Sequence, residues 1–343
     1  METNNDILFK FINNSFISEF LEDGVTDITY NGEYLFVENS SSGKIKVNKE
    51  IKNEHVGNFL SHLANISGKN FNSLNPILDI SFLNYRLNAM HPLIAKKNNK
   101  GVYTFALRVY SRKIMINSHD NSFCPIRVHN FLEKIIKNKK SILICGKTGV
   151  GKTEFQKYLV GYMEENTKIV LIEDLYETFI KELYPKLDIV SWVSFDNQKN
   201  IVNEYDKLIK AALRNNPDWL MIAEVRGKEA KELYTSFTTG HPFIATIHAK
   251  NASLCLKRFV QMMEEDVYNN EIYLDLAEYI PFSISLNKRI EGGKIKRYIE
   301  SIVENVVINN NIVYQEIYNY RLGLCISKLS RKMKKELGYK EEK

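Results

Sequence analysis

A glycine-rich segment constrains this 343-residue chain more than any other feature. It matches the phosphate-binding pattern G-x-x-x-x-G-K-[S/T] and comprises Gly146, Lys147, Thr148, Gly149, Val150, Gly151, Lys152 and Thr153. An apolar run at 141–145 precedes the segment, and a helical pattern follows it. The pattern therefore predicts a loop between a strand and a helix, in which backbone N–H groups and the positive helix end converge on phosphate oxygens.

The same pattern predicts roles for individual side chains in binding ATP and Mg²⁺. Lys152 is expected to bridge the β- and γ-phosphates, and the Thr153 hydroxyl is expected to bind Mg²⁺. All eight residues of the segment are candidates for nucleotide binding, and we include the next residue, Glu154, among them.

The rest of the chain divides into two patterns. From residue 128 onward, apolar strands at 141–145, 168–173, 219–224 and 243–247 alternate with helices at 128–137, 151–164, 199–214 and 227–238. Continuous apolar strands separated by helices predict a mainly parallel sheet that is covered on both faces. Before the turn-rich residues 115–126, helical segments at 6–22 and 50–67 accompany strands on both sides of Asn31-Gly32 and at 85–95 and 101–111. We therefore predict a smaller α+β domain at 1–118, a linker at 119–127 and an α/β domain at 128–343.

Composition excludes several other classes of protein. The chain is 44% hydrophobic and 26% charged, which is ordinary for a globular protein. It has no apolar run long enough to span a membrane, and its N-terminus lacks a signal-peptide pattern. Its four cysteines form no C-x-x-C pair, which argues against a zinc ribbon and favours a reducing compartment. The net charge of +6 suits an acidic protein, a membrane face or a nucleic acid without selecting among them.

Polar side chains end three of the predicted strands. They are Glu173, which Asp174 follows, then Glu224 and His248. The carboxyl ends of parallel strands meet at the ligand-binding edge of such a sheet, so all three are candidate catalytic residues. Glu173 and Glu224 are each able to activate water or hold Mg²⁺, and which of them is the general base stays open. A helix cap at 173–174 and a structural role for His248 are the alternatives.

Four blocks in this order resemble the type II/type IV secretion traffic ATPases. They are similar to that family's Walker A motif at 146–153, aspartate box at 172–177, Walker B motif at 218–227 and histidine box at 239–249. Ala223 stands where the family usually has glycine. The chain lacks a tetracysteine zinc module, which favours the type IV secretion and conjugation branch, although the pilus-retraction branch also lacks zinc.

The resemblance implies a RecA-like P-loop domain preceded by a smaller domain, and a homohexamer that hydrolyses ATP. Such a motor would energise type IV secretion, conjugative transfer or pilus assembly at the cytoplasmic face of the bacterial inner membrane, with membrane-embedded machinery proteins as partners. The family also places arginines of its N-terminal domain on the nucleotide, and Arg86 and Arg108 match them. The alternation in 104–109 puts Arg108 on the opposite face from Phe105 and Leu107, where simple exposure to solvent is the alternative.

Two other functions fit the same motifs. One is a nucleotide-gated assembly module that hydrolyses ATP weakly, which the presence of Glu173, Glu224 and His248 argues against. The other is a P-loop motor that translocates DNA. The basic residues are scattered along the sequence and form no nucleic-acid-binding motif, so direct binding of nucleic acid is compatible with the sequence but unsupported.

Overall fold

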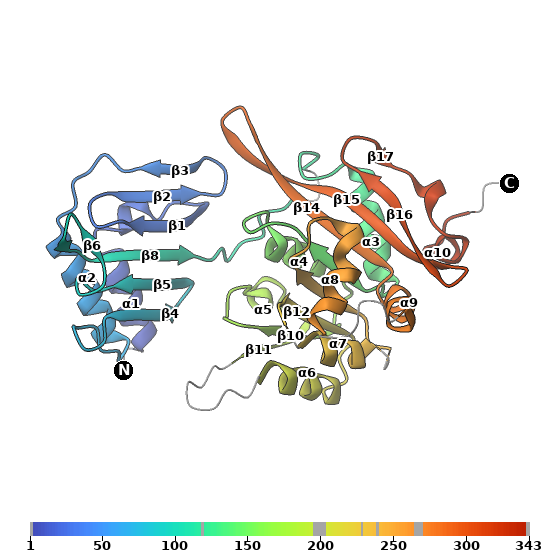
Figure 1. Cartoon of the computed structure of the whole chain (residues 1–343), viewed down its shortest axis with the longest axis horizontal. Coiled ribbons are helices and arrows are strands. Elements are labelled where there is room, and N and C mark those ends of the chain that lie inside the picture. The colour runs from blue at the N-terminus through green and yellow to red at the C-terminus, as the bar shows by residue number, and fades with distance from the viewer. Residues whose placement is uncertain are drawn as a thin grey trace. The chain divides into compact units, whose positions relative to one another are not determined.

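The computed structural model describes residues 3–117, 120–194, 204–227, 229–237, 240–263 and 270–340. The chain forms two compact units. Unit 1 comprises Met1–Arg112 together with Ile290–Ile295, and unit 2 comprises Lys113–Arg289 together with Lys296–Lys343. The predicted domain boundaries stay predictions, and each unit is described by itself (Figure 1).

Unit 1 is an antiparallel sheet with helices on one face. Among the described residues the sheet has six strands in the order β3-β2-β1-β8-β5-β4. Its strands are β1 (Val25–Tyr30), β2 (Leu35–Asn39), β3 (Gly43–Lys46), β4 (Ile77–Phe82), β5 (Tyr85–Met90) and β8 (Thr104–Val109). Two helices, α1 (Asn4–Asn13) and α2 (Asn53–Ile66), pack their apolar side chains on it, and β6 (Lys96–Lys97) and β7 (Lys100–Gly101) form a separate small ribbon.

Local sequence explains the ends of these elements. The Asn31 carboxamide oxygen accepts from the N–H groups of Glu33 and Tyr34, which closes the predicted turn between β1 and β2. Helix α1 is shorter than the predicted 6–22, because the Ser15 hydroxyl donates to the Ile12 carbonyl and competes with the next helical hydrogen bond. A short 3₁₀ turn at Ser18–Phe20 follows.

Unit 2 is built on a mainly parallel sheet. Among the described residues it has nine strands in the order β11-β10-β12-β13-β9-β14-β15-β16-β17, with parallel pairing from β11 to β14 and antiparallel pairing from β15 to β17. The strands are β9 (Ile142–Cys145), β10 (Lys168–Glu173), β11 (Asp188–Val193), β12 (Trp219–Val225), β13 (Phe243–Ile247), β14 (Phe282–Glu291), β15 (Lys294–Ile308), β16 (Asn311–Asn319) and β17 (Gly323–Leu324).

Helices cover both faces of this sheet, as predicted. Ile142 and Ile144 of β9 belong to one apolar cluster, and Leu143 and Cys145 belong to the other. The first cluster includes side chains of α3 (Ile126–Lys137), α4 (Lys152–Val160), α5 (Ile180–Leu183) and α10 (Arg331–Glu336), and the second includes those of α6 (Glu204–Arg214), α7 (Glu229–Phe237), α8 (Cys255–Met262) and α9 (Asn270–Tyr279). Residues 199–203 of one predicted helix lie outside the described residues. In the part of the chain that is described, no helix combines the length and apolarity needed to cross a membrane.

Candidate active site

The glycine-rich loop joins β9 to α4, as the sequence predicts. Gly146 has a φ of +145°, and a methyl group there would lie 2.6 Å from the carbonyl oxygen of Leu286 on β14. Gly151 has a φ of +93° and precedes the first residue of α4, so the chain enters the helix through a left-handed residue. The loop therefore leads directly into a helix N-terminus, whose first N–H groups have no partner within the helix.

The Lys152 side chain folds back against this loop. Its ammonium group donates a hydrogen bond of 3.0 Å to the carbonyl of Gly146. Burial lowers the pKa of Lys152, and the negative charge of Glu224 partly opposes that effect. A desolvated cation held by one neutral carbonyl is suited to exchange that carbonyl for an anionic oxygen.

The other predicted nucleotide-binding residues differ in their surroundings. Lys147, Thr148 and Gly149 are exposed at the loop, and the Val150 side chain is buried. The Thr153 side chain, in the first turn of α4, is partly buried.

Glu154 is engaged away from the loop's glycines. One of its carboxylate oxygens pairs with the buried ammonium of Lys157 at 2.8 Å, and the other accepts from the backbone N–H of Met115 at 3.3 Å. The contact with Met115 ties the first turn of α4 to the segment before α3, and the contact with Lys157 lies within α4. The predicted contact of Glu154 with nucleotide stays a prediction.

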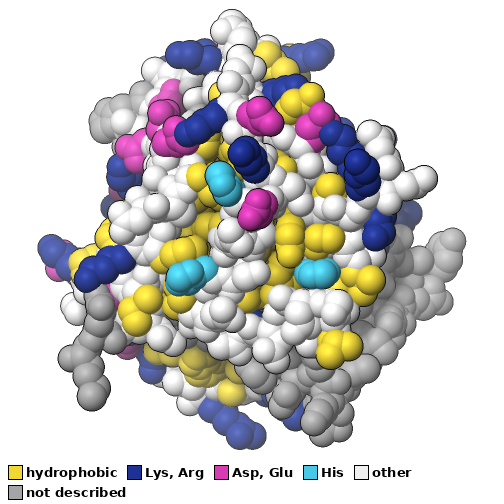
Figure 2. Space-filling model, turned by 90° about the vertical axis from the view of Figure 1, so that its left-hand side faces the viewer, with side chains coloured by type: hydrophobic (Ala, Val, Ile, Leu, Met, Phe, Trp, Pro, Cys, Tyr) yellow, Lys and Arg dark blue, Asp and Glu magenta, His cyan; other side chains and the backbone are white. Residues whose placement is uncertain are grey.

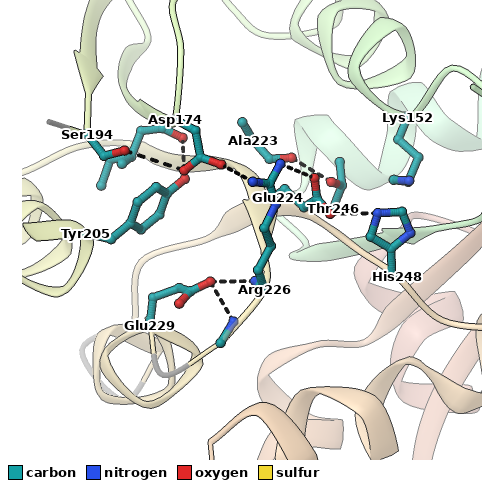
Figure 3. A network of polar contacts seen from close by, with 12 residues as sticks. Lys152, Asp174, Ser194, Tyr205, Ala223, Glu224, Arg226, Glu229, Thr246 and His248 are labelled. Atoms are coloured by element: carbon teal, nitrogen blue, oxygen red, sulfur yellow. Dashed lines mark hydrogen bonds and ion pairs between the residues drawn. The ribbon is translucent and has the colours of Figure 1, made fainter. Parts of the chain in front are cut away.

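A chain of polar contacts links the ends of β10, β12 and β13 (Figure 3). Arg226 lies between two carboxylates, at 2.6 Å from an Asp174 oxygen and 2.8 Å from a Glu224 oxygen. The second Glu224 oxygen is 2.7 Å from Nε2 of His248. Lys152 lies at the His248 end of this chain. The structure thus brings together Lys152, Glu224 and His248, three of the residues that the sequence selects.

Buried contacts hold this arrangement in place. The Glu229 carboxylate at the start of α7 accepts from the N–H groups of Arg226, at 2.5 Å, and Gly227, at 2.9 Å. The Thr246 hydroxyl donates to the carbonyl of Ala223 at 2.6 Å. The Ala223 position, where the family usually has glycine, therefore supports Glu224 through its backbone.

The two carboxylates beside Arg226 have pKa values shifted in opposite directions. Burial raises the pKa of Glu224, but the hydrogen bond and charge of Arg226, with the charges of His248 and Lys152, outweigh it and lower that pKa overall. For Asp174, burial dominates and raises the pKa in spite of Arg226. Glu224 therefore stays ionised to lower pH than an ordinary glutamate, so it is a carboxylate at neutral pH.

Glu173 occupies a different environment from Glu224. Its side chain is fully buried, and one oxygen accepts from the N–H groups of Glu177, at 2.7 Å, and Thr178, at 3.3 Å. The other oxygen accepts from the Thr178 hydroxyl at 2.6 Å. Burial raises the pKa of Glu173, and these hydrogen bonds oppose the rise. The carboxylate organises the loop after β10, and it bonds to N–H groups that precede α5 rather than capping that helix. Its predicted catalytic and metal-binding roles stay predictions.

The two arginines predicted to reach the nucleotide lie in unit 1. Arg108 of β8 and Arg86 of β5 are paired in register across the sheet, on the face opposite the buried Leu107. Arg108 pairs with Asp27 at 3.2 Å, and Arg86 pairs with Asp79 at 3.7 Å. The predicted alternation along β8 is confirmed, whereas the role of each arginine at a nucleotide stays a prediction.

Comparison with known proteins identifies the family. The family model described as "Type II/IV secretion system protein" matches residues 80–289, which is more than half of the chain. The chain belongs to this family. An uncharacterized protein of Bacillus anthracis is 31% identical over 328 residues, which cover 91% of this chain and 72% of the relative. The type IV secretion system protein VirB11 of Bartonella quintana is 31% identical over 170 residues, 48% of this chain and 46% of the relative.

Solved structures of secretion and pilus ATPases share the fold. The ATPase DotB of Legionella pneumophila has a TM-score of 0.61 at 19% identity, with 88% of this chain and 80% of DotB covered. The pilus retraction motor PilT with bound ADP has a TM-score of 0.56 at 20% identity, with 86% of this chain and 83% of PilT covered. These comparisons confirm the predicted fold class, an N-terminal α+β domain and a P-loop α/β domain.

Proposed function

We propose that this chain is an ATP-hydrolysing motor that assembles as a homohexamer and energises type IV secretion, conjugative transfer or a related pilus machine. The observation that supports it most is the meeting of Lys152, Glu224 and His248 at the strand ends beside the glycine-rich loop. The site combines the ionised carboxylate of Glu224, the desolvated cation of Lys152 and a glycine loop too tightly packed at Gly146 to admit a side chain. Such a combination is suited to phosphoryl transfer to water.

In this proposal each residue has a separate task. Lys152 leaves the Gly146 carbonyl for the β- and γ-phosphate oxygens. Glu224, held by Arg226, accepts a proton from the attacking water. His248, hydrogen-bonded to Glu224, responds to the presence of the γ-phosphate.

The residues present also fit Mg²⁺ beside the nucleotide. The Thr153 hydroxyl at the start of α4 is of the type that P-loop proteins use for this ion. Mg²⁺, when bound, neutralises charge on the β- and γ-phosphates. The hydrogen bonds that the Glu173 oxygens already accept favour Thr153 over Glu173 as its ligand.

The relatives support a place for the motor beside a secretion machine. Proteins named type IV secretion system protein VirB11 and type IV pilus ATPase PilU are similar to this chain. We infer the cytoplasmic face of the inner membrane as the location and membrane-embedded machinery proteins as the partners. Lys and Arg side chains are scattered among acidic ones on the face shown in Figure 2, which offers no support for a DNA-translocating motor.

The proposal is tested by phosphate release and light scattering on the purified chain, with and without Mg-ATP. We expect Mg²⁺-dependent hydrolysis and a mass of six subunits. A chain that stays monomeric and never hydrolyses ATP would overturn the motor. A hexamer that binds ATP without turning it over would instead favour the nucleotide-gated assembly module.

Two substitutions of Glu173 separate loop support from catalysis. Glutamine keeps an oxygen for the Glu177 N–H and an amide that donates to the Thr178 hydroxyl, so we expect the fold to survive. Alanine leaves these buried donors unsatisfied and should lower the free energy of unfolding by about 3 kcal/mol. Urea denaturation measures both variants, and phosphate release measures the rate of the glutamine variant.

The pH dependence of stability adds a check on Glu173. Its raised pKa means that the folded state binds the proton more tightly than the unfolded chain, so the wild type loses stability as pH rises through that range. Glu173→Gln lacks this loss and should gain stability relative to the wild type from acidic to neutral pH. An alanine variant as stable as the wild type would refute loop support. A glutamine variant that is stable but inactive would assign Glu173 to catalysis.

A further inference from the structure

The β14–β15 hairpin brings two cations to the glycine-rich loop, and no sequence motif indicates them. The Arg297 Nε–H on β15 donates to the carbonyl of Gly149 at 3.0 Å, and its Cδ lies 3.3 Å from where a Cβ on Gly151 would stand. The Lys288 ammonium on β14 lies 3.2 Å from where a Cβ on Gly149 would stand. Both residues belong to unit 2, so these contacts lie within one compact body.

The hydrogen bond from Arg297 sets the orientation of one peptide of the loop. A peptide unit is planar and trans, so its C=O and N–H point in opposite directions. With the Gly149 carbonyl held toward Arg297, the N–H of Val150 points away from Arg297. Arg297 thereby fixes the direction of an N–H in the segment that is expected to bind phosphate.

Lys288 contributes charge at the same loop. Its side chain is exposed, and among the described residues its ammonium forms no ion pair. Together with Lys152 and Arg297 it places three cations around one short loop. The exposed ammonium of Lys288 is able to form a charge-assisted hydrogen bond to a phosphate oxygen bound at this loop.

Hydrogen bonds between β14 and β15 anchor the hairpin close to Lys288. The Asn287 carboxamide donates to the Glu300 carboxylate at 2.9 Å, and the hydroxyls of Ser285 and Ser301 lie 2.9 Å apart. Asn287 directly precedes Lys288, so the backbone of the lysine is fixed beside the loop. A backbone anchored in this way does not have to be ordered when its side chains bind a ligand, which lowers the entropy cost of binding.

We infer that Lys288 binds a phosphate of a nucleoside di- or triphosphate directly and that Arg297 is a positioning residue, which acts through the Gly149 peptide. This inference rests on the proposed function. It assigns part of the phosphate site to an antiparallel hairpin outside the four sequence blocks.

Calorimetric titration tests the inference with ADP, a non-hydrolysable ATP analogue and inorganic tripolyphosphate. Lys288→Ala should weaken binding of all three by about tenfold, as expected for the loss of a hydrogen bond to a charged group. Lys288→Arg keeps the charge and should retain most of the affinity. Arg297→Ala should raise the Kd and the KM for ATP by a similar factor and leave kcat near the wild-type value.

Controls separate this inference from the proposed function and from a structural role. Lys294→Ala removes an exposed lysine near the turn of the same hairpin and should bind nucleotide like the wild type. If the wild type binds no ATP, the proposed function fails. If it binds ATP and the alanine variants of Lys288 and Arg297 bind equally well, the inference is overturned. A lower free energy of unfolding with an unchanged Kd would make Arg297 merely structural and would also overturn its assignment.

Discussion

Replacing Lys152 with alanine is expected to reduce ATP hydrolysis by at least about 10²–10³-fold, the loss typical for removing one group that stabilises transition-state charge. The Lys152 ammonium is desolvated, and its hydrogen-bond partner at 3.0 Å, the Gly146 carbonyl, is neutral. Phosphate oxygens offer a charge-assisted hydrogen bond in place of a neutral one. The variant lacks that bond in both the bound nucleotide and the transition state, so we expect a raised Kd for ATP and a lowered kcat.

The fold should survive this substitution. The Lys152 ammonium donates its hydrogen bond to the Gly146 carbonyl, within the loop, and the removal of a desolvated cation costs the folded state little. Lys186→Ala, which breaks an exposed pair with Glu165, is the matched control and should hydrolyse ATP like the wild type. Full ATP affinity together with wild-type turnover in Lys152→Ala would refute the P-loop assignment.

The sequence predicts the central strands well because burial dictates their composition. Strands β9, β10, β12 and β13 are almost completely buried, so each appears as a largely apolar run that ends at or close to a polar or glycine residue. The β14–β15 hairpin escapes such analysis. Residues 287–298 combine charged side chains with exposed apolar ones such as Ile290, so no buried face imposes a pattern.

The sequence also does not predict which of the two adjacent carboxylates, Glu173 or Asp174, faces the site. Successive side chains along a strand point to opposite sides, and Glu173 is the last residue of β10 while Asp174 directly follows it. Glu173 turns into its own loop, whereas Asp174 binds Arg226. The pairing with Arg226 depends on β10 lying next to β12, a strand order that local patterns do not contain. The one sequence signal for the contact of Arg226 with Glu224 is its position two residues after that glutamate.

Glu224→Gln should retain ATP and lose turnover by roughly 10²–10⁴-fold, the usual contribution of a general base. The amide has nearly the shape of the carboxylate. Its oxygen is able to accept from Arg226, and its NH₂ group is able to donate to His248, so both neighbours keep a partner. We therefore expect the variant to fold normally and to bind ATP without hydrolysing it.

The pH profile of the wild type tests the same assignment without a substitution. The guanidinium of Arg226, with His248 and Lys152, holds the pKa of Glu224 below the ordinary glutamate value in spite of burial. Protonation of a base stops its action, so kcat/KM should stay level until the pH falls below that ordinary value. Glu173, whose pKa burial raises above the ordinary glutamate value, would give an acid limb at higher pH if it were the base. Phosphate release measured across this range, with ATP binding by calorimetry, decides between them. Normal turnover in Glu224→Gln would exclude Glu224 as the base and return that role to Glu173.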